Sequence, residues 1–370
     1  MTTHIAIIGG GRVGAAIEAV TARLGGYRAM VIDRADVPYC AQRMNSETEL
    51  FISDDTEKIL SALNRFFSKT PAKKCAVVFA LSHVQAYPLL IPLDQRLSQG
   101  IRFLVVGRPA DVDPAVFTRR PIHFGAGLEP GLAEALLQVL HKKMVMPDCI
   151  ETYCGGLPHI PSAPAWHEMN FATESAFTNR TSLARINGCE VKRPRFDTRD
   201  QVFFPDFGVL ECYDDALLPE TLSEPNLSTV PTLHQRTLRW PGFAAFALSD
   251  LSPNEKTAAV TPRGEDVVLL AARVQKDHRQ FEIIVRTDPC SGFSAMAWAT
   301  ALGSIAALVA GMSIEHQARC IFPAADRNDS VFYSFKDIVQ QFGPDGSGTS
   351  ICWTGSHQTQ RILEEDSCHD

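Results

Sequence analysis

Residues 4–14 have the sequence HIAIIGGGRVG, in which an apolar run leads directly into glycines with the spacing Gly-x-Gly-x-x-Gly. The apolar run predicts a buried parallel strand, and the glycines predict a tight turn into a helix. In such a turn Gly9 permits the bend and Gly11 lets a pyrophosphate approach the backbone. Gly14 lets the helix pack closely on the strand.

A second predicted strand supplies a residue for the same site. Residues 29–32 (AMVI) are apolar and lead into Asp33, about twenty residues after the glycines, where a carboxylate would accept hydrogen bonds from an adenosine ribose. Together with the N–H groups at the helix start, around Arg12 and Val13, this predicts a dinucleotide-binding site. Asp33 would repel a 2′-phosphate and so favours NAD, whereas a guanidinium at Arg34 could neutralise that phosphate, which leaves NADP open.

Length and composition exclude several classes of protein. The chain has 370 residues, enough for two domains, and its 45% hydrophobic and 21% charged content is typical of a globular protein. The net charge of −7 provides no basic surface for nucleic acid or an anionic membrane. The ten cysteines include no CxxC pair or zinc-site spacing, so we expect no metal and reduced thiols in a cytoplasm. The nearly uncharged stretch 293–312 has the length of a membrane span, but its small residues predict a buried helix instead.

Alternating helices and strands continue to about residue 127, which is typical of a parallel, doubly wound sheet. The expected elements are helices at 56–67 and 89–99 and strands at 75–81, 101–106 and 121–125. The carboxyl end of the strand at 75–81 carries Ala80, Leu81 and Ser82, which we assign to the cofactor site. His83 could contact a ligand there or be a solvated loop residue.

Residues 125–132 (GAGLEPGL) predict a sharp passage from a strand into a helix. Glu129 lies just before that helix, where an acid could serve the chemistry or only complement the helix dipole. Beyond residue 147 the predicted strands favour a mixed sheet. We therefore expect an α/β protein with a Rossmann domain at 1–127, completed by helices within 292–342, a second α/β domain at 128–291, and a loosely held polar tail at 343–370.

Five segments in order match the patterns of one family. They are GGGRVG at 9–14, GLEPGL at 127–132, YCGGLP at 153–158, FPDFGVLECY at 204–213 and TLRWPG at 237–242. The chain resembles the saccharopine dehydrogenase-like oxidoreductases, which include saccharopine reductases, lysine 6-dehydrogenases and carboxynorspermidine dehydrogenases. The resemblance covers residues 4 to about 320.

The resemblance implies hydride transfer between a nicotinamide and a carbon that bears an amine, so that an amine and an imine interconvert. Glu129, beside the substrate amine, and Cys154 are the implied catalytic residues. The residues implied to line the pocket are Cys154, Gly155, Gly156 and Leu157. Arg239 is implied to bind a substrate carboxylate, which its planar fork matches, although a strand-surface ion pair would also explain it. The resemblance further implies a dimer interface in the second domain, hence a homodimer.

The chain departs from the family pattern where the substrate is recognised. Residues 106–108 (VGR) replace an aspartate of many relatives, residues 165–168 (AWHE) replace the usual NPLGY, and residues 174–185 are only loosely similar. We therefore expect the reaction class, with a lysine 6-dehydrogenase- or saccharopine dehydrogenase-like activity on an amino-acid-like substrate. His167 is a candidate general acid, because an imidazole titrates near neutrality, or else a solvated loop residue. The alternative function is a non-catalytic dinucleotide-binding sensor or assembly protein.

Overall fold

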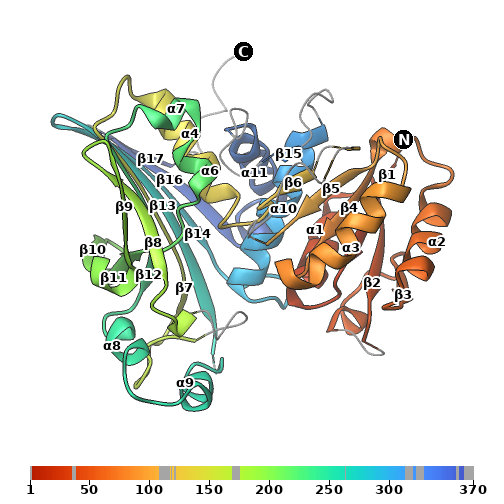
Figure 1. Ribbon diagram of the computed structural model, residues 1–370, viewed down its shortest axis with the longest axis horizontal. Helices are drawn as coiled ribbons and strands as arrows, with labels where there is room; N and C mark the ends of the chain where they lie inside the picture. Colours follow the sequence, from red (N-terminus) through yellow and green to blue (C-terminus); the bar gives the residue numbers. More distant parts are fainter. Residues whose placement is uncertain are drawn as a thin grey trace. The chain divides into compact units, whose positions relative to one another are not determined.

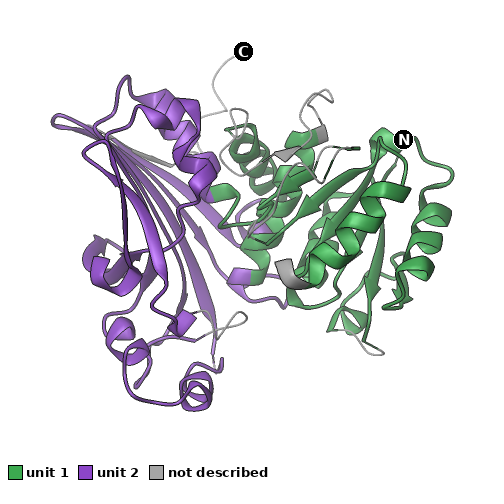
Figure 2. Ribbon diagram, viewed as in Figure 1, with its two compact units in different colours: residues 1–132, 297–342 green, residues 133–296, 343–370 purple. Residues whose placement is uncertain are grey.

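The computed structural model describes residues 2–35, 39–107, 117, 119–120, 122–168, 176–262, 264–312, 320–321, 329–355 and 358–361 (Figure 1). The chain divides into two compact units (Figure 2). The first comprises Met1–Leu132 and Ala297–Phe342, and the second comprises Ala133–Met296 and Gly343–Asp370. The chain therefore leaves the first unit, builds most of the second, and returns to complete the first.

The first unit is built on a parallel sheet. Its seven described strands lie in the order β15-β6-β5-β4-β1-β2-β3, and all neighbours run parallel. Their bounds are β1 Thr3–Ile8, β2 Tyr27–Asp33, β3 Glu49–Ile52, β4 Cys75–Phe79, β5 Arg102–Val105, β6 Ile122–Phe124 and β15 Cys320–Ile321. The chain runs from β1 outward to β3 and resumes at β4 on the other side of β1. The predicted doubly wound sheet is confirmed, and ligands of such sheets bind at the carboxyl ends of the strands beside this reversal.

Helices accompany this sheet, and their apolar sides enter its core. Their bounds are α1 Arg12–Leu24, α2 Thr56–Phe67, α3 His83–Arg96, α10 Ala295–Met312 and α11 Asp329–Phe342, with 3-10 turns η1 Tyr39–Gln42 and η2 Ala72–Lys74. Leu63 and Phe66 of α2 and Leu90 and Leu93 of α3 lie in one buried cluster with Phe79 of β4. Burial of a side chain of this size stabilises the fold by about 1.5–3 kcal/mol.

The second unit is built on a mixed sheet, as predicted. Among the described residues it has ten strands, with the main order β10-β11-β12-β7-β13-β14-β16-β17 and with β8 paired to β12 and β9. Their bounds are β7 Cys149–Pro158, β8 Thr181–Ile186, β9 Cys189–Pro194, β10 Asp200–Phe204, β11 Gly208–Asp214, β12 Thr232–Arg239, β13 Asp266–Lys276, β14 Arg279–Thr287, β16 Thr349–Gly355 and β17 Gln358–Arg361. Only β12 and β7 run parallel among these pairs; the other pairs are antiparallel.

Short helices and one longer one complete the second unit. They are α4 Leu132–Lys143, whose first residue belongs to the first unit, α6 Pro219–Leu222, α7 Pro225–Ser228, α8 Phe243–Ala247, α9 Pro253–Ala259 and α12 Pro344–Ser347, with the 3-10 turn η4 Arg195–Thr198. Glu134 of α4 accepts a hydrogen bond from the Gln235 amide of β12 at 2.8 Å, and both side chains are fully buried. This contact fixes α4 against one face of the sheet.

The stretch that follows Gly343 adds a strand to the second sheet. The seven residues of β16 pair antiparallel with β14, and the Ile351 side chain is buried while Ser350 is exposed. The expectation of a loosely held polar tail from residue 343 is therefore wrong for 344–355. A polar strand of this length hardly differs from a loop in sequence, because its neighbour β14 supplies the hydrogen bonds and the burial. Residues 362–370 lie outside the described part of the chain.

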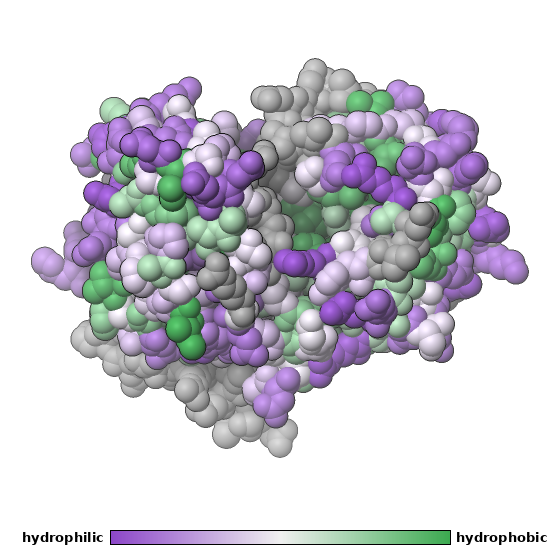
Figure 3. Space-filling view, turned by 90° about the horizontal axis from the view of Figure 1, so that it is seen from below, coloured by the Kyte–Doolittle hydropathy of each residue, from purple (hydrophilic) through white to green (hydrophobic). Residues whose placement is uncertain are grey.

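The described residues were compared with what a membrane span and a metal site require. None of the helices in these residues has the length and hydropathy that a membrane crossing would need. In the same residues, no three or more His, Cys, Asp or Glu side chains are grouped so as to hold a metal ion. On the face of the molecule in Figure 3, hydrophilic residues spread over the surface with hydrophobic ones scattered among them.

Candidate functional site

The glycine turn between β1 and α1 has the geometry of a phosphate cradle. Gly9 has φ +105°, and a Cβ there would lie 2.7 Å from the carbonyl oxygen of Ala80, while a Cβ on Gly14 would lie 1.8 Å from the carbonyl oxygen of Gly9. Both positions require glycine for the fold itself. A Cβ on Gly11 would meet nothing within 4 Å among the described residues, so packing does not explain this glycine. Gly11 is also the N-cap of α1 and offers no side chain to its first N–H groups, which are thus placed for an anion.

The other predicted cofactor residues gather around this turn. Asp33, at the end of β2, accepts the Gly10 N–H at 2.5 Å and the Ala35 N–H at 2.8 Å. Arg34 follows it and is exposed. The carboxylate therefore supports the glycine turn directly, in addition to the ribose contact expected of it.

The start of α1 and the end of β4 supply the remaining predicted cofactor residues. Arg12 and Val13 are the first two residues of α1, exposed and half-buried. Ala80 and Leu81 follow β4, and both contact the position of a Gly9 Cβ. Ser82 is the N-cap of α3, and its hydroxyl donates to Gln85 Oε1 at 3.1 Å. All of these groups lie at the carboxyl ends of β1, β2 and β4, where the strand order reverses.

Glu129 lies in a tightly packed loop that leads into α4. Gly131 has φ +136°, and a Cβ there would lie 2.3 Å from the carbonyl oxygen of Gly127. Gly303 of α10 is equally close to the loop, since its Cβ would lie 2.5 Å from the same oxygen, and Ser304 donates to the Ala126 carbonyl at 2.6 Å. The loop is therefore held by backbone packing on α10, and it presents Glu129 half-buried.

Three of the family-like segments meet on neighbouring strands of the second sheet. Thr237 of β12 pairs in register with Cys154 of β7 on one side and with Tyr213 of β11 on the other. Arg239 pairs with Glu211 in the same β11–β12 ladder. Because paired residues share a face and side chains alternate along a strand, these five residues lie on one face of the sheet.

The rest of the Cys-Gly-Gly-Leu-Pro segment is divided between the two faces. Gly156 shares the face of Cys154, and a Cβ on it would lie 2.5 Å from Met296 Cε. Gly155 and Leu157 alternate to the other face, where Leu157 is fully buried in a hydrophobic cluster with Leu238 and others. The expectation that Leu157 lines a pocket with Cys154 and Arg239 is therefore wrong, because its side chain belongs to the core. A Cβ on Gly155 would lie 2.6 Å from the Leu238 carbonyl oxygen, so close strand packing explains this glycine.

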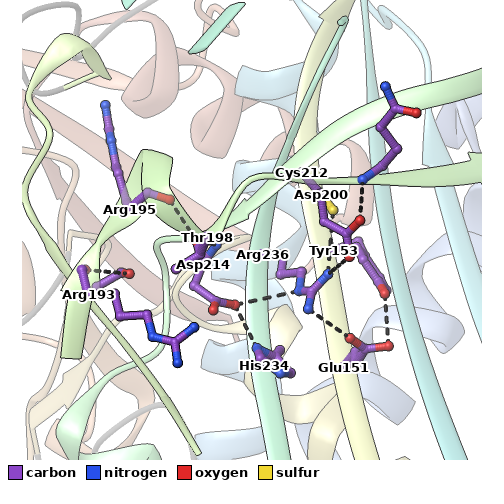
Figure 4. Close-up of polar contacts among 12 residues, drawn as sticks. Glu151, Tyr153, Arg193, Arg195, Thr198, Asp200, Cys212, Asp214, His234 and Arg236 are labelled. Carbon is purple, nitrogen blue, oxygen red and sulfur yellow. Dashed lines mark hydrogen bonds and ion pairs between the residues drawn. The ribbon is translucent and has the colours of Figure 1, made fainter. Parts of the chain in front are cut away.

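The opposite face of β12 carries an arginine that lies among carboxylates (Figure 4). The Arg236 guanidinium lies 3.5 Å from Glu151, 3.3 Å from Asp200 and 3.5 Å from Asp214. His234 Nδ1 lies 2.8 Å from Asp214 Oδ1 in the same group. These carboxylates neutralise the positive charge within the chain, which is typical of a structural ion-pair network.

Arg239 differs from Arg236 in its partners. Its Nη1 donates to the Leu238 carbonyl at 2.6 Å and its Cζ lies 5.4 Å from the centre of the Phe243 ring. Its Nε is buried without a hydrogen bond, and no carboxylate of the described residues forms an ion pair with this half-buried guanidinium. The strand-surface ion pair considered as an alternative is therefore absent from the described part of the chain.

Two residues to which the sequence analysis assigned no role, Glu211 and Tyr213, lie on the face of the sheet that carries Arg239. Glu211 accepts the N–H groups of Gly242 at 3.2 Å and Ala244 at 2.7 Å, so it caps α8 directly after the segment with Arg239. Tyr213 is buried, and burial raises the pKa of its hydroxyl to about 12, so it is protonated at neutral pH. Both residues stand in the LECY motif, so the motif contained the signal, but only strand pairing reveals which face they share.

An ion-pair group lies beside these residues. Asp215 accepts from Arg180 at 2.9 Å, from Arg195 at 3.3 Å and from the Thr237 hydroxyl at 3.3 Å. Arg195 is buried, and it also donates to the carbonyl of Ala176. Arg195 therefore forms an ion pair with Asp215, whereas Arg239 forms none with the described residues.

His167 is buried rather than solvated. It is 5% exposed, its ring lies 5.1 Å from that of Phe243 in an edge-to-face contact, and its Nδ1 has no hydrogen-bond partner among the described residues. Burial, with the nearby Arg239 charge as a second cause, lowers the pKa of His167 well below its ordinary value. The expectation of an acid that titrates near neutrality is therefore wrong, because the imidazole is neutral there.

Comparisons with known proteins place this geometry in a fold. No family model matches the chain, and no curated protein matches it. Among solved structures, saccharopine dehydrogenase (L-Glu forming) from Saccharomyces cerevisiae superimposes with a TM-score of 0.74 at 12% identity, over 95% of this chain and 99% of that one. The fold is saccharopine dehydrogenase-like.

Two further solved structures match at lower similarity. Diaminopimelate (DAP) dehydrogenase from C. glutamicum has a TM-score of 0.45 at 9% identity, over 88% of this chain and 94% of that one. Dihydrodipicolinate reductase from Paenisporosarcina sp. TG-14 has a TM-score of 0.40 at 11% identity, over 87% and 98%.

Proposed function

We propose that this chain is an oxidoreductase that uses a nicotinamide dinucleotide to interconvert an amine and an imine of an amino-acid-like substrate. The observation that carries the proposal is the state of Arg239. Its guanidinium has no carboxylate partner among the described residues, and strand pairing brings Cys154, Glu211 and Tyr213 to the same face. A planar guanidinium in that state matches the carboxylate of an amino acid, which it can bind through two parallel hydrogen bonds.

The first unit fits the proposed cofactor. The open position at Gly11 and the uncapped start of α1, at Arg12 and Val13, would hold the pyrophosphate, and Asp33 would hold the ribose. A bound dinucleotide would supply or accept the hydride. The charge of Asp33 favours NAD over NADP.

The second unit and the Glu129 loop fit the proposed substrate chemistry. Arg239 would hold the substrate carboxylate, and Cys154 shares its face of the sheet. The Glu129 carboxylate would attract the cationic ammonium or iminium group. The name of the yeast enzyme with this fold, saccharopine dehydrogenase, supports this reaction class, with a lysine- or saccharopine-like molecule as the substrate.

A turnover screen tests the proposal. Absorbance of the reduced nicotinamide is followed with NAD or NADP plus L-lysine or L-saccharopine, and with NADH or NADPH plus imines formed from amino acids and keto acids. We expect turnover with at least one substrate that carries a carboxylate, and none with its decarboxylated analogue. A chain that binds NADH and turns over none of these substrates would instead support the non-catalytic sensor.

Substitution of Arg239 sharpens the screen. Loss of a bidentate charged hydrogen bond costs about 1.5–3 kcal/mol, so Arg239→Ala should lower kcat/KM by roughly one to two decades. Arg239→Lys, which keeps the charge without the fork, should recover only part of the loss. The matched control is Arg28→Ala, which removes an exposed arginine from the first unit and should leave kcat/KM unchanged. An Arg239→Ala variant with parent-like kcat/KM would remove the carboxylate from the proposal.

A further inference from the structure

Two buried nitrogen atoms near the end of β12 lack hydrogen-bond partners in the described part of the chain. They are Nδ1 of His167 and Nε of Arg239. His167 is more than nine-tenths buried. Buried polar groups in proteins are nearly always paired, because an unpaired one has lost its water without replacement. Two such nitrogens in one place therefore point to a group that binds both.

The two side chains converge on the same aromatic ring. The His167 ring lies 5.1 Å from the Phe243 ring with an interplanar angle of 78°, and Arg239 Cζ lies 5.4 Å from the Phe243 centre. The Arg239 charge also acts on the His167 imidazole. Arg195 and Arg236 also have an Nε without a hydrogen bond. However, the Arg195 guanidinium is bound to Asp215 and to the Ala176 carbonyl, and the Arg236 guanidinium lies among three carboxylates on the opposite face. The pair that remains available is His167 and Arg239.

The segment before His167 is held in a strained conformation against the turn that follows Arg239. Trp166 has φ +52°, a left-handed conformation that is unusual for so large a side chain. A Cβ on Gly242 would lie 2.8 Å from Trp166 Cδ1, so the indole packs directly on this glycine. A strained backbone conformation of this kind persists only where the surrounding structure holds it, and it is common at binding sites. Here the packing of Trp166 on Gly242 also holds the next residue, His167, beside Phe243.

We infer that His167 and Arg239 together bind one carboxylate of the substrate, with His167 donating from Nδ1 and Arg239 donating from Nε. This rests on the proposed function and deepens it, because it makes His167 a residue that determines specificity for carboxylates rather than a general acid. A carboxylate has enough lone pairs to accept from both donors, and the adjacent guanidinium supplies the opposite charge. A neutral imidazole can donate this hydrogen bond from Nδ1, and Arg239 alone then supplies the positive charge that attracts the carboxylate.

Binding of glutarate to the full chain tests the inference without any turnover. The probe is titrated by calorimetry, and 1,5-pentanediol, which has the same carbon chain and no carboxylate, is the matched probe. We expect glutarate to bind and pentanediol not to bind. His167→Phe keeps an aromatic ring against Phe243 but has no donor, and it should weaken glutarate binding about tenfold. His167→Asn, whose amide can replace the Nδ1 donor, should remain within about threefold of the parent.

Further variants separate a joint site from two independent effects. Arg239→Ala should weaken binding at least as much as His167→Phe, and the double variant should lose less than the product of the two single losses. His159→Asn, at an exposed histidine, is the matched control and should not change glutarate affinity. With a substrate in hand, His167→Phe should raise KM and keep kcat, and His167→Asn should leave both close to the parent values, whereas loss of a general acid would lower kcat and remove a limb of its pH profile.

The contradicting results are distinct from failure of the proposed function. NADH affinity is measured separately through the fluorescence of the bound cofactor, so a chain that does not bind NADH refutes the proposed function. A parent that does not bind glutarate, or a folded His167→Phe variant with parent-like affinity, overturns the inference about this pair.

Discussion

Asp33 has two tasks, one through the hydrogen bonds of its carboxylate and one through its charge. Its carboxylate accepts the N–H groups of Gly10 and Ala35, so it supports the glycine turn as an acceptor. Its negative charge is a separate property, and in the proposed function this charge disfavours a 2′-phosphate. The carboxylate uses both oxygens, Oδ2 for the Gly10 N–H and Oδ1 for the Ala35 N–H. Asparagine removes the charge and, with its single acceptor oxygen, keeps only one of these two hydrogen bonds.

We expect Asp33→Asn to narrow the difference between the affinities for NADH and NADPH, and its melting temperature should lie between those of the parent and of Asp33→Ala. Titration of both cofactors by fluorescence, with thermal unfolding alongside, measures the two effects. Asp33→Ala, which removes charge and acceptor together, is the comparison and should also lower the melting temperature. Equal affinities for NADH and NADPH in the parent would instead assign the choice of cofactor to Arg34.

His123 makes the stability of the first unit depend on pH. It lies in β6, and burial lowers the pKa of its imidazole to about 4. In the unfolded chain a histidine titrates near 6.5, so below that pH the unfolded state binds the proton first and the native state loses stability. The stabilisation is thus fully present above pH 6.5 and is lost as the pH falls toward 4.

Replacement of His123 by phenylalanine should remove this dependence. Between pH 6.5 and pH 5 the parent should lose roughly 1.5 kcal/mol of unfolding free energy more than His123→Phe. Urea unfolding at the two pH values measures the difference between the two proteins. Parallel loss in parent and variant would mean that His123 is not neutral in the native state.

For single residues, the steric or chemical role could be predicted from the sequence more often than the contacts that the residue makes. The spacing of Gly9, Gly11 and Gly14 could be interpreted because each position of this turn has its own steric demand. The hydrogen bond from Gly10 to Asp33 could not, since it depends on how two strands are aligned. Burial of His167 was also invisible, because its loop packs on a turn more than seventy residues later in the chain.

In the turn from β1 into α1, Gly14 is required by the packing of the fold, whereas Gly11 is required only by the proposed ligand. Gly14→Ala places a methyl group 1.8 Å from the Gly9 carbonyl oxygen. Overpacking of this kind costs about 1–3 kcal/mol, more than the ~1 kcal/mol that alanine gains over glycine in a helix, so the variant should be less stable. The Cβ of Gly11→Val meets no atom within 4 Å among the described residues, so the variant should fold like the parent and bind NADH about tenfold more weakly or worse. Thermal unfolding and NADH titration of both variants check this pair, and tight NADH binding by Gly11→Val would place the cofactor elsewhere.

The strand β16 gives a second test at this scale. Ile351→Ala should lower the unfolding free energy by about 2–4 kcal/mol because the side chain is buried. Ser350→Ala, on the exposed side of the same strand, should change it by less than about 0.5 kcal/mol. Chemical denaturation measures both. Two equally small effects would mean that β16 is as loosely held as its polar sequence suggested.

The existence and type of the long elements could be predicted, while their ends and faces could not. The helix expected at 89–99 begins instead at His83, because Pro88 and Pro92 lie inside α3 and mask its periodicity. β8 and β9 were not predicted, since both carry polar residues that gain their order from pairing with each other and with β12. The pairing of β7 with β13 sets Leu157 beside Val267 of the buried cluster, and a motif alone contains no register.

The molecule as a whole contains two sheets, and each is made from parts of the chain that alternate along the sequence with parts of the other. The first unit provides the reversal of strand order and the glycine turn that fit a dinucleotide. The second provides a face with Cys154, Tyr213 and Arg239 that fits an amino-acid-like substrate. Fold similarity to saccharopine dehydrogenase extends over 95% of the chain, so both units belong to this architecture.

Transfer of deuterium from the cofactor to the product is a direct test of the proposed interconversion of an imine and an amine. The chain is incubated with NADH that carries deuterium at both C4 positions of the nicotinamide, together with the imines used in the turnover screen, and the products are analysed by mass spectrometry. We predict an amine that is heavier by one deuterium at the former imine carbon, and much less of this product with Gly11→Val at the same NADH concentration. Unlabelled amine, or no amine at all from a chain that binds both NADH and the candidate substrate, would contradict it.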